Sequence, residues 1–413
     1  MMDIIDGGVT TPVGFRAAGV ACGIKRPTAD GGTPLDLAML AADETVPAAG
    51  VFTTNKATAA PVEISRAHLA ASGGHARVVV INSGCANACT GPAGVDAAQQ
   101  MAAAAAAALG CPATEVLIAS TGVIGVQLDP AKVRAGVEAA HRVVDTAGGP
   151  AAARAIMTTD PFPKSCAAVV ETGGGRFRVG GMAKGSGMIE PRMATMLAVL
   201  TTDAAIAPDV LGGALRRVVD DSFNAITVDG ECSTNDCVFL LASGRAGVAF
   251  TRDDDPRLLD ALGAVAGRLA RDIVRGGEGA TRLVTVRVTG AATDSDARLA
   301  ARTIANSPLV KTAIHGGDPN WGRLVAAAGR SGAAFVLDRA SVAIGPADPR
   351  APQVELFARG VPHDERADEA AALLRGTEVT VTVDVGAGGT HAATMWTCDF
   401  SAEYVRINAE YRT

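Results

Sequence analysis

The sequence predicts an α+β protein built as a layered sandwich of strands and helices. Strand-like and helix-like segments mix irregularly, without the steady β-α-β alternation that is typical of a doubly wound sheet. The composition is 48% hydrophobic and 19% charged, which is ample for a buried core. Six apolar runs have the length of strands: RVVVI (77–81), EVLIAS (115–120), MLAVLTT (196–202), CVFLLAS (237–243), RLVTVRVTG (282–290) and EVTVTVDV (378–385).

Helices are predicted where the sequence contains clear start and stop signals. The alanine-rich segment 95–110 reads as a helix that ends at Gly110. Asp129-Pro130 offers an N-cap and a first-turn proline for a helix through Val144. Asp255-Pro256 repeats this signal for a long amphipathic helix that runs to about Arg275, where two glycines stop it.

The length of 413 residues indicates two or three domains. We expect a boundary in the region 285–310, because the residues beyond it carry strands of their own and a helix at 364–375. The prediction is therefore an N-terminal catalytic domain, 1–285, and a C-terminal α/β domain, 286–413, whose tail completes the active site.

Charge and hydropathy exclude several kinds of partner. The net charge is −6 and there is no run of five or six like charges, which argues against nucleic acid or an anionic membrane. Residues 1–15 lack the pattern of a signal peptide. The longest apolar run, 101–109, is much shorter than the roughly 20 residues that span a bilayer. A cytoplasmic location is expected.

The eight cysteines do not form the framework of a small disulfide-rich protein. The pairs Cys85/Cys89 and Cys232/Cys237 could be read as half-sites for zinc. However, both pairs lack the two-residue spacing and the nearby histidines of a zinc site. We therefore interpret them as small side chains in a reducing compartment and expect no metal.

The segment STGVIG, 120–125, directly follows one of the predicted strands. The Thr121-Gly122 pair could bend the backbone so that N–H groups point at an oxyanion. An ordinary turn would have the same sequence, so the residues alone leave both interpretations open.

A second segment, KGSGMIEPRMATML (184–197), joins Lys184 and two glycines to an apolar run that contains Thr195. Thr195 could simply be a strand former. As a nucleophile it would need a base, and the six histidines lie outside any nucleophile-like motif. Its own α-amino group, with an ordinary pKa of about 7.7–8.0, would serve if the chain were cleaved after Ala194. The lysine precedes its glycines, so this is no phosphate-binding loop.

Two further segments contain candidate binding residues. GGEGATR (276–282) places Glu278 between glycines after the long predicted helix. The C-terminal residues SAEYVRINAEYRT look ordered, although chain ends usually fray, so Tyr404, Asn408 and Tyr411 predict a docked tail.

Together these segments closely resemble the ornithine acetyltransferase family, also called glutamate N-acetyltransferase, of arginine biosynthesis. The resemblance extends over essentially the whole chain. The matching blocks are GVTTPVGFRAAGVACGIK (8–25), GVFTTN (50–55), NSGCANACTG (82–91), ASTGVIG (119–125), MTTDPFPK (157–164), KGSGMIEPRMATML (184–197), STNDCV (233–238), GGEGATR (276–282), NSPLVKTAIHGGDPNWGR (306–323) and YVRINAEYRT (404–413).

The resemblance implies a precursor that cuts itself between Ala194 and Thr195. The products would be an α chain, 1–194, and a β chain, 195–413, which stay together as an α2β2 heterotetramer. The implied fold is an α+β sandwich similar to the self-cleaving aminopeptidases of the DmpA type.

The resemblance also implies the reaction. Acetyl would move from N2-acetyl-L-ornithine to L-glutamate in a ping-pong mechanism, through an ester on the nucleophile Thr195, with Thr121 and Gly122 as the oxyanion hole. Lys184 would pair with a substrate carboxylate and Glu278 with the ornithine ammonium. The full set of substrate-binding positions is Thr158, Lys184, Thr195, Glu278, Asn408 and Thr413. Thr159 is an alternative to Thr158.

Other functions remain open from the sequence. A hydrolase of the same self-cleaving fold would use water as acceptor, either as an acetylornithine deacylase or as an aminopeptidase. A non-catalytic binding protein would stay uncleaved. No cofactor is expected, and the motifs do not decide whether acetyl-CoA serves as a second acetyl donor.

Overall fold

The computed structural model describes residues 1–28, 31–190, 196–348 and 350–410. These residues form two compact units. The first unit contains residues 1–224 and 231–273, and the second contains 225–230 and 274–413. The predicted boundary at 285/286 stays a prediction.

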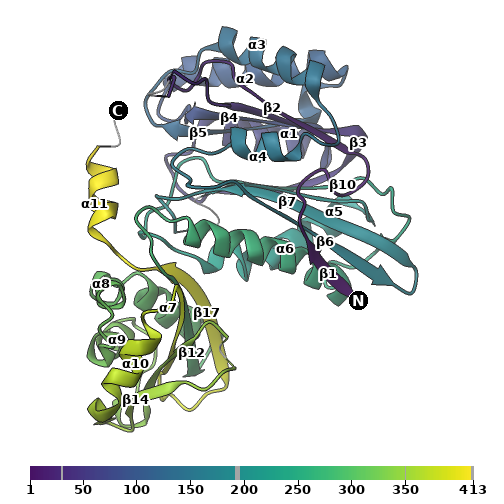
Figure 1. Ribbon diagram of the computed structural model, residues 1–413. Helices are drawn as coiled ribbons and strands as arrows, with labels where there is room; N and C mark the ends of the chain where they lie inside the picture. Colours follow the sequence, from purple (N-terminus) through teal and green to yellow (C-terminus); the bar gives the residue numbers. More distant parts are fainter. Residues whose placement is uncertain (29–30, 191–195, 349, 411–413) are drawn as a thin grey trace. The chain divides into compact units, whose positions relative to one another are not determined.

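The first unit is organised around a nine-stranded sheet (Figure 1). Its strands are β1 (Met2–Ile5), β2 (Phe15–Val20), β3 (Leu37–Phe52), β4 (His75–Cys85), β5 (Val116–Val123), β6 (Lys164–Thr172), β7 (Gly175–Lys184), β8 (Leu197–Thr202) and β10 (Cys237–Ala242). They follow the order β1-β6-β7-β8-β10-β3-β4-β5, with β2 paired to β3. The short strands β9 (Ala205–Ile206) and β11 (Ala249–Phe250) pair separately.

The long strand β3 connects the two halves of this sheet. Its first residues, 37–41, pair with β4, and its last residues, 48–52, pair with β10. After a register shift between Ala41 and Val46, Val46 and Pro47 also pair with β4, so the pairing changes to β10 only at residue 48. The halves pack face to face, because Leu40 and Ile81 share one buried apolar cluster with Phe239. The first unit is therefore a sandwich of two half-sheets.

Helices cover both outer faces of the sandwich (Figure 1). Met39 and Val80 point from the β3–β4 half into a second cluster with α2 and α3. On the other half, a Cβ placed on Gly181 would lie within about 3 Å of Val265 and Leu269 in α6. The helices of this unit are α1 (Ala60–Ala71), α2 (Gly91–Leu109), α3 (Pro130–Val143), α4 (Gly149–Ala155), α5 (Pro208–Asp220) and α6 (Pro256–Arg275).

The second unit has a six-stranded sheet in the order β15-β14-β13-β16-β12-β17. In β12, Val284, Val286 and Val288 are buried, whereas Arg287 is exposed, which is the alternation of a sheet covered on one face. Helices α7 to α10 cover this face. The elements are β12 (Leu283–Ala291), α7 (Asp294–Ala305), α8 (Pro308–Gly316), α9 (Trp321–Gly329), β13 (Ser341–Pro346), β14 (Val354–Ala358), β15 (Val361–Pro362), α10 (Ala367–Leu373), β16 (Glu378–Asp384), β17 (His391–Cys398) and α11 (Ala402–Ala409).

The predicted α+β class and layered arrangement are confirmed, and all six predicted strands are present. The three predicted helices begin and end within a few residues of their signals. Gly110 adopts φ 64° after α2, and the Asp129 side chain caps α3 by accepting from the amides of Ala131 and Lys132. The expected helix at 364–375 is shorter, since residues 364–366 form a 3-10 turn before α10.

No helix among the described residues is long and apolar enough to cross a membrane. All eight cysteines lie in the described part of the chain, and each is a free thiol.

Candidate active site

Thr121 and Gly122 lie near the end of β5, which pairs in parallel with β4. The sequence suggests that the strand stops at Ser120, but pairing continues to Val123 with an irregular register at Gly84 and Cys85. Gly122 has φ 130°, and a Cβ there would lie 2.3 Å from the carbonyl carbon of Gly84. Only glycine fits this close approach of two backbones.

A buried amide network supports this end of β5. The Ser120 hydroxyl donates to Asn82 Oδ1 at 2.5 Å. From a distant segment, Asn235 Nδ2 donates to the carbonyls of Ala86 (2.5 Å) and Ser120 (2.9 Å). Asn235 was not predicted as a site residue, although it lies in the STNDCV block. Its amide ties the segments before Thr121 and after β4 to a third part of the chain.

Lys184, the last residue of β7, points toward Thr121 at this end of β5. Its ammonium donates to Thr121 Oγ1 at 3.1 Å, and both side chains are buried. A lysine ammonium cannot accept a hydrogen bond. The Thr121 oxygen is therefore the acceptor, and its O–H proton has no acceptor among the residues that the structure describes.

Asp160 organises the residues next to Lys184. Its Oδ1 accepts from the Lys164 ammonium at 2.6 Å and from the Gly185 amide at 2.7 Å, and its Oδ2 accepts from the Thr158 amide at 3.0 Å. Burial would raise the pKa of this carboxyl, but the charges of Lys184 and Lys164, with the Gly185 amide, lower it to about 2. One carboxylate thus holds two predicted substrate-binding segments. Of the two candidate threonines, Thr158 is half-buried and Thr159 is exposed.

The second unit brings together two other predicted residues. Glu278 is buried in the glycine-rich segment after α6, and the Asn408 amide of α11 donates to Glu278 Oε2 at 2.8 Å. The tail also docks through Tyr404, whose hydroxyl donates to Asp229 at 3.2 Å, and through Ser401, whose hydroxyl donates to the Gly279 carbonyl at 2.6 Å. The predicted docking of the tail is confirmed for Tyr404 and Asn408, and Tyr411 lies outside the described residues.

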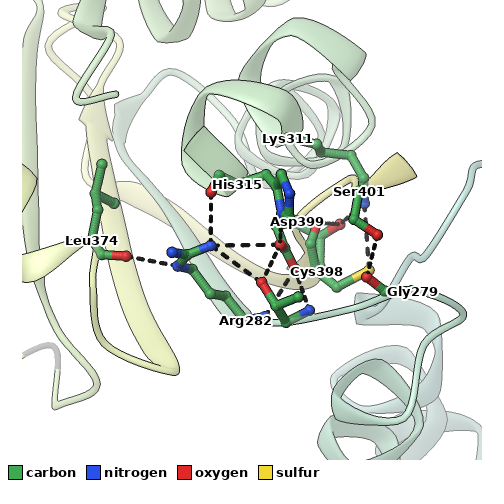
Figure 2. Close-up of polar contacts among 10 residues, drawn as sticks. Gly279, Arg282, Lys311, His315, Leu374, Cys398, Asp399 and Ser401 are labelled. Carbon is green, nitrogen blue, oxygen red and sulfur yellow. Dashed lines mark hydrogen bonds and ion pairs between the residues drawn. The ribbon is translucent and has the colours of Figure 1, made fainter. Parts of the chain in front are cut away.

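Asp399 is the anchor of the Glu278 segment (Figure 2). Its Oδ1 accepts from the amides of Thr281 (2.7 Å) and Arg282 (2.8 Å). Its Oδ2 accepts from the Thr281 hydroxyl (2.5 Å) and contacts Nδ1 of His315 (2.7 Å). Burial would raise the pKa of Asp399, but the hydrogen bonds from Thr281, His315 and the two amides lower it. These hydrogen bonds of Asp399 were not predicted from the sequence.

Three predicted site residues lie outside the described residues: Ala194 and Thr195 at the expected cleavage point, and Thr413 at the end of the tail. The neighbouring backbone is described. Leu197, two positions after Thr195, pairs with Lys184 across β7 and β8. Within the described ranges, no cluster of three or more His, Cys, Asp or Glu side chains could hold a metal ion.

The buried Lys184 ammonium, the Thr121 hydroxyl and Gly122 thus lie together at one end of the β4–β5 pair. Acyl-transfer enzymes use donors of these kinds to stabilise an oxyanion. The model of the ArgJ family matches residues 16–413. The chain belongs to the ArgJ family.

Curated relatives match over the full length. The "Arginine biosynthesis bifunctional protein ArgJ" of Symbiobacterium thermophilum is 48% identical, with 100% of both chains covered. The protein of the same name from Chlorobaculum tepidum is 47% identical over 97% of this chain and 96% of its own. Among solved structures, the ornithine acetyltransferase of Mycobacterium tuberculosis complexed with ornithine is 44% identical, covers 47% of this chain and 100% of its own, and has a TM-score of 0.43.

Removing the Asp160 charge should destabilise the first unit. Asp160→Asn leaves the buried Lys164 ammonium unpaired, and we expect a loss of about 3–5 kcal/mol in the free energy of unfolding. The double variant Asp160→Asn/Lys164→Met removes both charges and should recover much of the loss. Denaturant unfolding measures both changes, and a double variant no more stable than the single one would contradict the ion-pair account.

Asp399→Asn should weaken the second unit by about 1.5–3 kcal/mol at pH 7, the typical value of a hydrogen bond to a charged group. The folded-state pKa of Asp399 is lowered, so its stabilising effect is present above the ordinary pKa of 3.8 and is lost as the pH falls below it. The difference between wild type and variant should therefore shrink in acid. Thermal unfolding from pH 7 to pH 3 measures this, and a constant difference would contradict the assignment.

Proposed function

We propose that this chain transfers acetyl from N2-acetyl-L-ornithine to L-glutamate in arginine biosynthesis. The observation that carries the proposal is the hydrogen bond from Lys184 to Thr121 beside the constrained Gly122. It supplies an anion site and a polarised hydroxyl at the positions where the family resemblance puts substrate and oxyanion. Membership of the ArgJ family and relatives named for arginine biosynthesis support it.

In the first half-reaction, Thr195 Oγ attacks the acetyl carbonyl of acetylornithine, and the α-amino group of Thr195 takes the hydroxyl proton. Negative charge develops on the carbonyl oxygen, which Thr121 and Gly122 stabilise by donating hydrogen bonds. The C–N bond then breaks, ornithine leaves with the proton, and acetyl remains as an ester on Thr195. In the second half-reaction, the glutamate amine attacks the ester, and acetylglutamate leaves as Thr195 regains its proton.

The charge on Lys184 has two effects in this scheme. Donation to Thr121 Oγ1 orients the hydroxyl so that its proton can face the oxyanion, and it makes that proton a better donor. The remaining N–H groups of the ammonium bind the substrate carboxylate. Thr158, held by Asp160, and Thr413 with Asn408 complete the proposed substrate contacts, and Glu278 binds the ornithine ammonium.

The proposal includes cleavage and assembly. Cutting between Ala194 and Thr195 exposes the α-amino group that acts as base, and the α chain (1–194) and β chain (195–413) remain associated as α2β2 in the cytoplasm. Because the curated relatives are named as bifunctional, we extend the proposal to acetyl-CoA as a second acetyl donor.

Denaturing mass spectrometry with N-terminal sequencing tests the cleavage. We expect two chains, one of which begins Thr195-Met196-Leu197, and a single chain for Thr195→Ala. Turnover of acetylornithine should require glutamate. If acetylornithine is consumed at the same rate without glutamate, water is the acceptor and the chain is a hydrolase. A wild-type chain that stays intact would contradict the nucleophile.

Glu278→Gln should raise KM for acetylornithine by about 10-fold or more, since it removes a charged partner of the ornithine ammonium. Glu403→Gln is the matched control, because Glu403 is an exposed carboxylate of α11 that pairs with Arg406. Steady-state kinetics measures both variants. An unchanged KM in Glu278→Gln would contradict the role of Glu278.

A further inference from the structure

Lys25 lies in the connection between β2 and β3, and its backbone is held by one buried carboxylate. Asp36 accepts from the amides of Cys22 (2.7 Å), Ile24 (2.6 Å) and Lys25 (3.0 Å). Three amide donors on one fully buried aspartate fix the path of this segment. The Lys25 side chain therefore extends from a backbone segment whose position is fixed by these hydrogen bonds.

This side chain packs against the strand pair that carries the oxyanion segment. A Cβ placed on Gly84 would lie 2.9 Å from Lys25 Cγ and 3.3 Å from the Lys25 amide nitrogen. Gly84 is in turn the β4 partner of Gly122, and the two backbones touch. The Lys25 side chain thus lies against Gly84, and Gly84 lies against Gly122. Glycine at both strand positions permits these close approaches.

The Lys25 ammonium is in the same electrostatic environment as the predicted site. It donates to the Leu35 carbonyl at 2.8 Å, which uses one of its three N–H groups. Burial lowers the pKa of Lys25, the charges of Asp36 and Asp160 oppose that shift, and the charge of Lys184 adds to it. The charges that act on the pKa of Lys25 thus include two residues of the predicted site and its support, Lys184 and Asp160.

The ammonium groups of Lys25, Lys164 and Lys184 interact with two carboxylates, Asp36 and Asp160, so one positive charge is in excess among these five groups. Asp160 forms its ion pair with Lys164. Over the ranges that the structure describes, neither Lys184 nor Lys25 has a carboxylate within ion-pair distance. Two lysines on separate segments thus lie near one Thr-Gly pair without an ion-paired carboxylate, so each can bind one carboxylate of a ligand that carries two.

The two substrates of the proposed reaction differ in this respect. Acetylornithine carries one carboxylate and a side-chain ammonium, whereas glutamate carries two carboxylates. We propose that Lys25 binds the second, side-chain carboxylate of the glutamate acceptor and is a specificity-determining residue for the second half-reaction. This inference rests on the proposed function.

The ping-pong scheme allows the two half-reactions to be measured separately. In Lys25→Met, the burst of ornithine released from acetylornithine without glutamate should stay within about 2-fold of wild type. KM for glutamate should rise by about 10- to 100-fold, the range expected for loss of a charge-assisted hydrogen bond. The preference for glutamate over glutamine as acceptor should fall by a similar factor, because glutamine presents a neutral amide at the same position.

Two variants serve as controls. Lys132→Met removes a lysine that donates to the Gly23 carbonyl of the same segment at 2.7 Å and should leave KM for glutamate unchanged. Lys25→Arg keeps the charge and should retain most of the preference for glutamate. Circular dichroism and thermal unfolding of each variant establish that it is folded.

The outcomes separate this inference from the proposed function. If the wild-type protein releases no ornithine burst, the proposed function fails. If the burst is present and Lys25→Met keeps the wild-type KM and preference for glutamate, the role of Lys25 is overturned. Equal slowing of both half-reactions, or unfolding of Lys25→Met together with loss of glutamate preference in Lys25→Arg, would also overturn it, because Lys25 would then be structural.

Discussion

The hydrogen bond from Lys184 to Thr121 is the interaction on which the site depends. Lys184 ends β7 in one half of the sandwich, and Thr121 lies in β5 of the other half. A buried ammonium is stable only if polar groups replace its water shell. Packing of the two half-sheets is therefore coupled to formation of the hydrogen bond between the Lys184 ammonium and the Thr121 hydroxyl. The apolar packing between the halves supplies most of the driving force, and the buried lysine places a positive charge beside the Thr121 hydroxyl.

Within each unit, glycines and buried aspartates constrain the backbone around predicted site residues. A Cβ on Gly122 would lie 2.3 Å from the Gly84 carbonyl carbon, so the two backbones approach each other too closely for a side chain. Asp160 then fixes the Thr158 and Gly185 amides, and Asp399 fixes the Thr281 and Arg282 amides of the Glu278 segment. In each unit one buried carboxylate orients a loop that carries predicted substrate-binding residues, which preorganises the loop without contacting the substrate.

The sequence predicts those features that are encoded locally. Gly110 and Asp129 mark helix ends because a left-handed residue and an N-cap act on their immediate neighbours. The six strands follow from short apolar runs. The strand β3 was missed because the polar residues DET, 43–45, interrupt its apolar pattern at the register shift of its pairing with β4.

The residues that position the site could not be predicted in the same way. Asn235 acts on Ser120 from 115 residues away, and Asp399 acts on Thr281 from 118 residues away. Nothing in the neighbouring sequence distinguishes these two buried side chains from polar residues that lie on the surface. By contrast, the predicted site residues Thr121, Gly122, Lys184, Glu278 and Asn408 came from motifs, and the structure gives each of them a specific polar or backbone contact.

The measurement that tests the central claim most directly is peptide mapping of the acetyl-enzyme. The purified protein would be incubated with acetylornithine in the absence of glutamate, quenched in acid and digested, and the acetyl group located by tandem mass spectrometry. The account predicts an acetyl ester on the peptide that begins at Thr195, which disappears when glutamate is added. Acetyl on another residue, or none on a protein that turns over acetylornithine with glutamate, would contradict a covalent intermediate on Thr195.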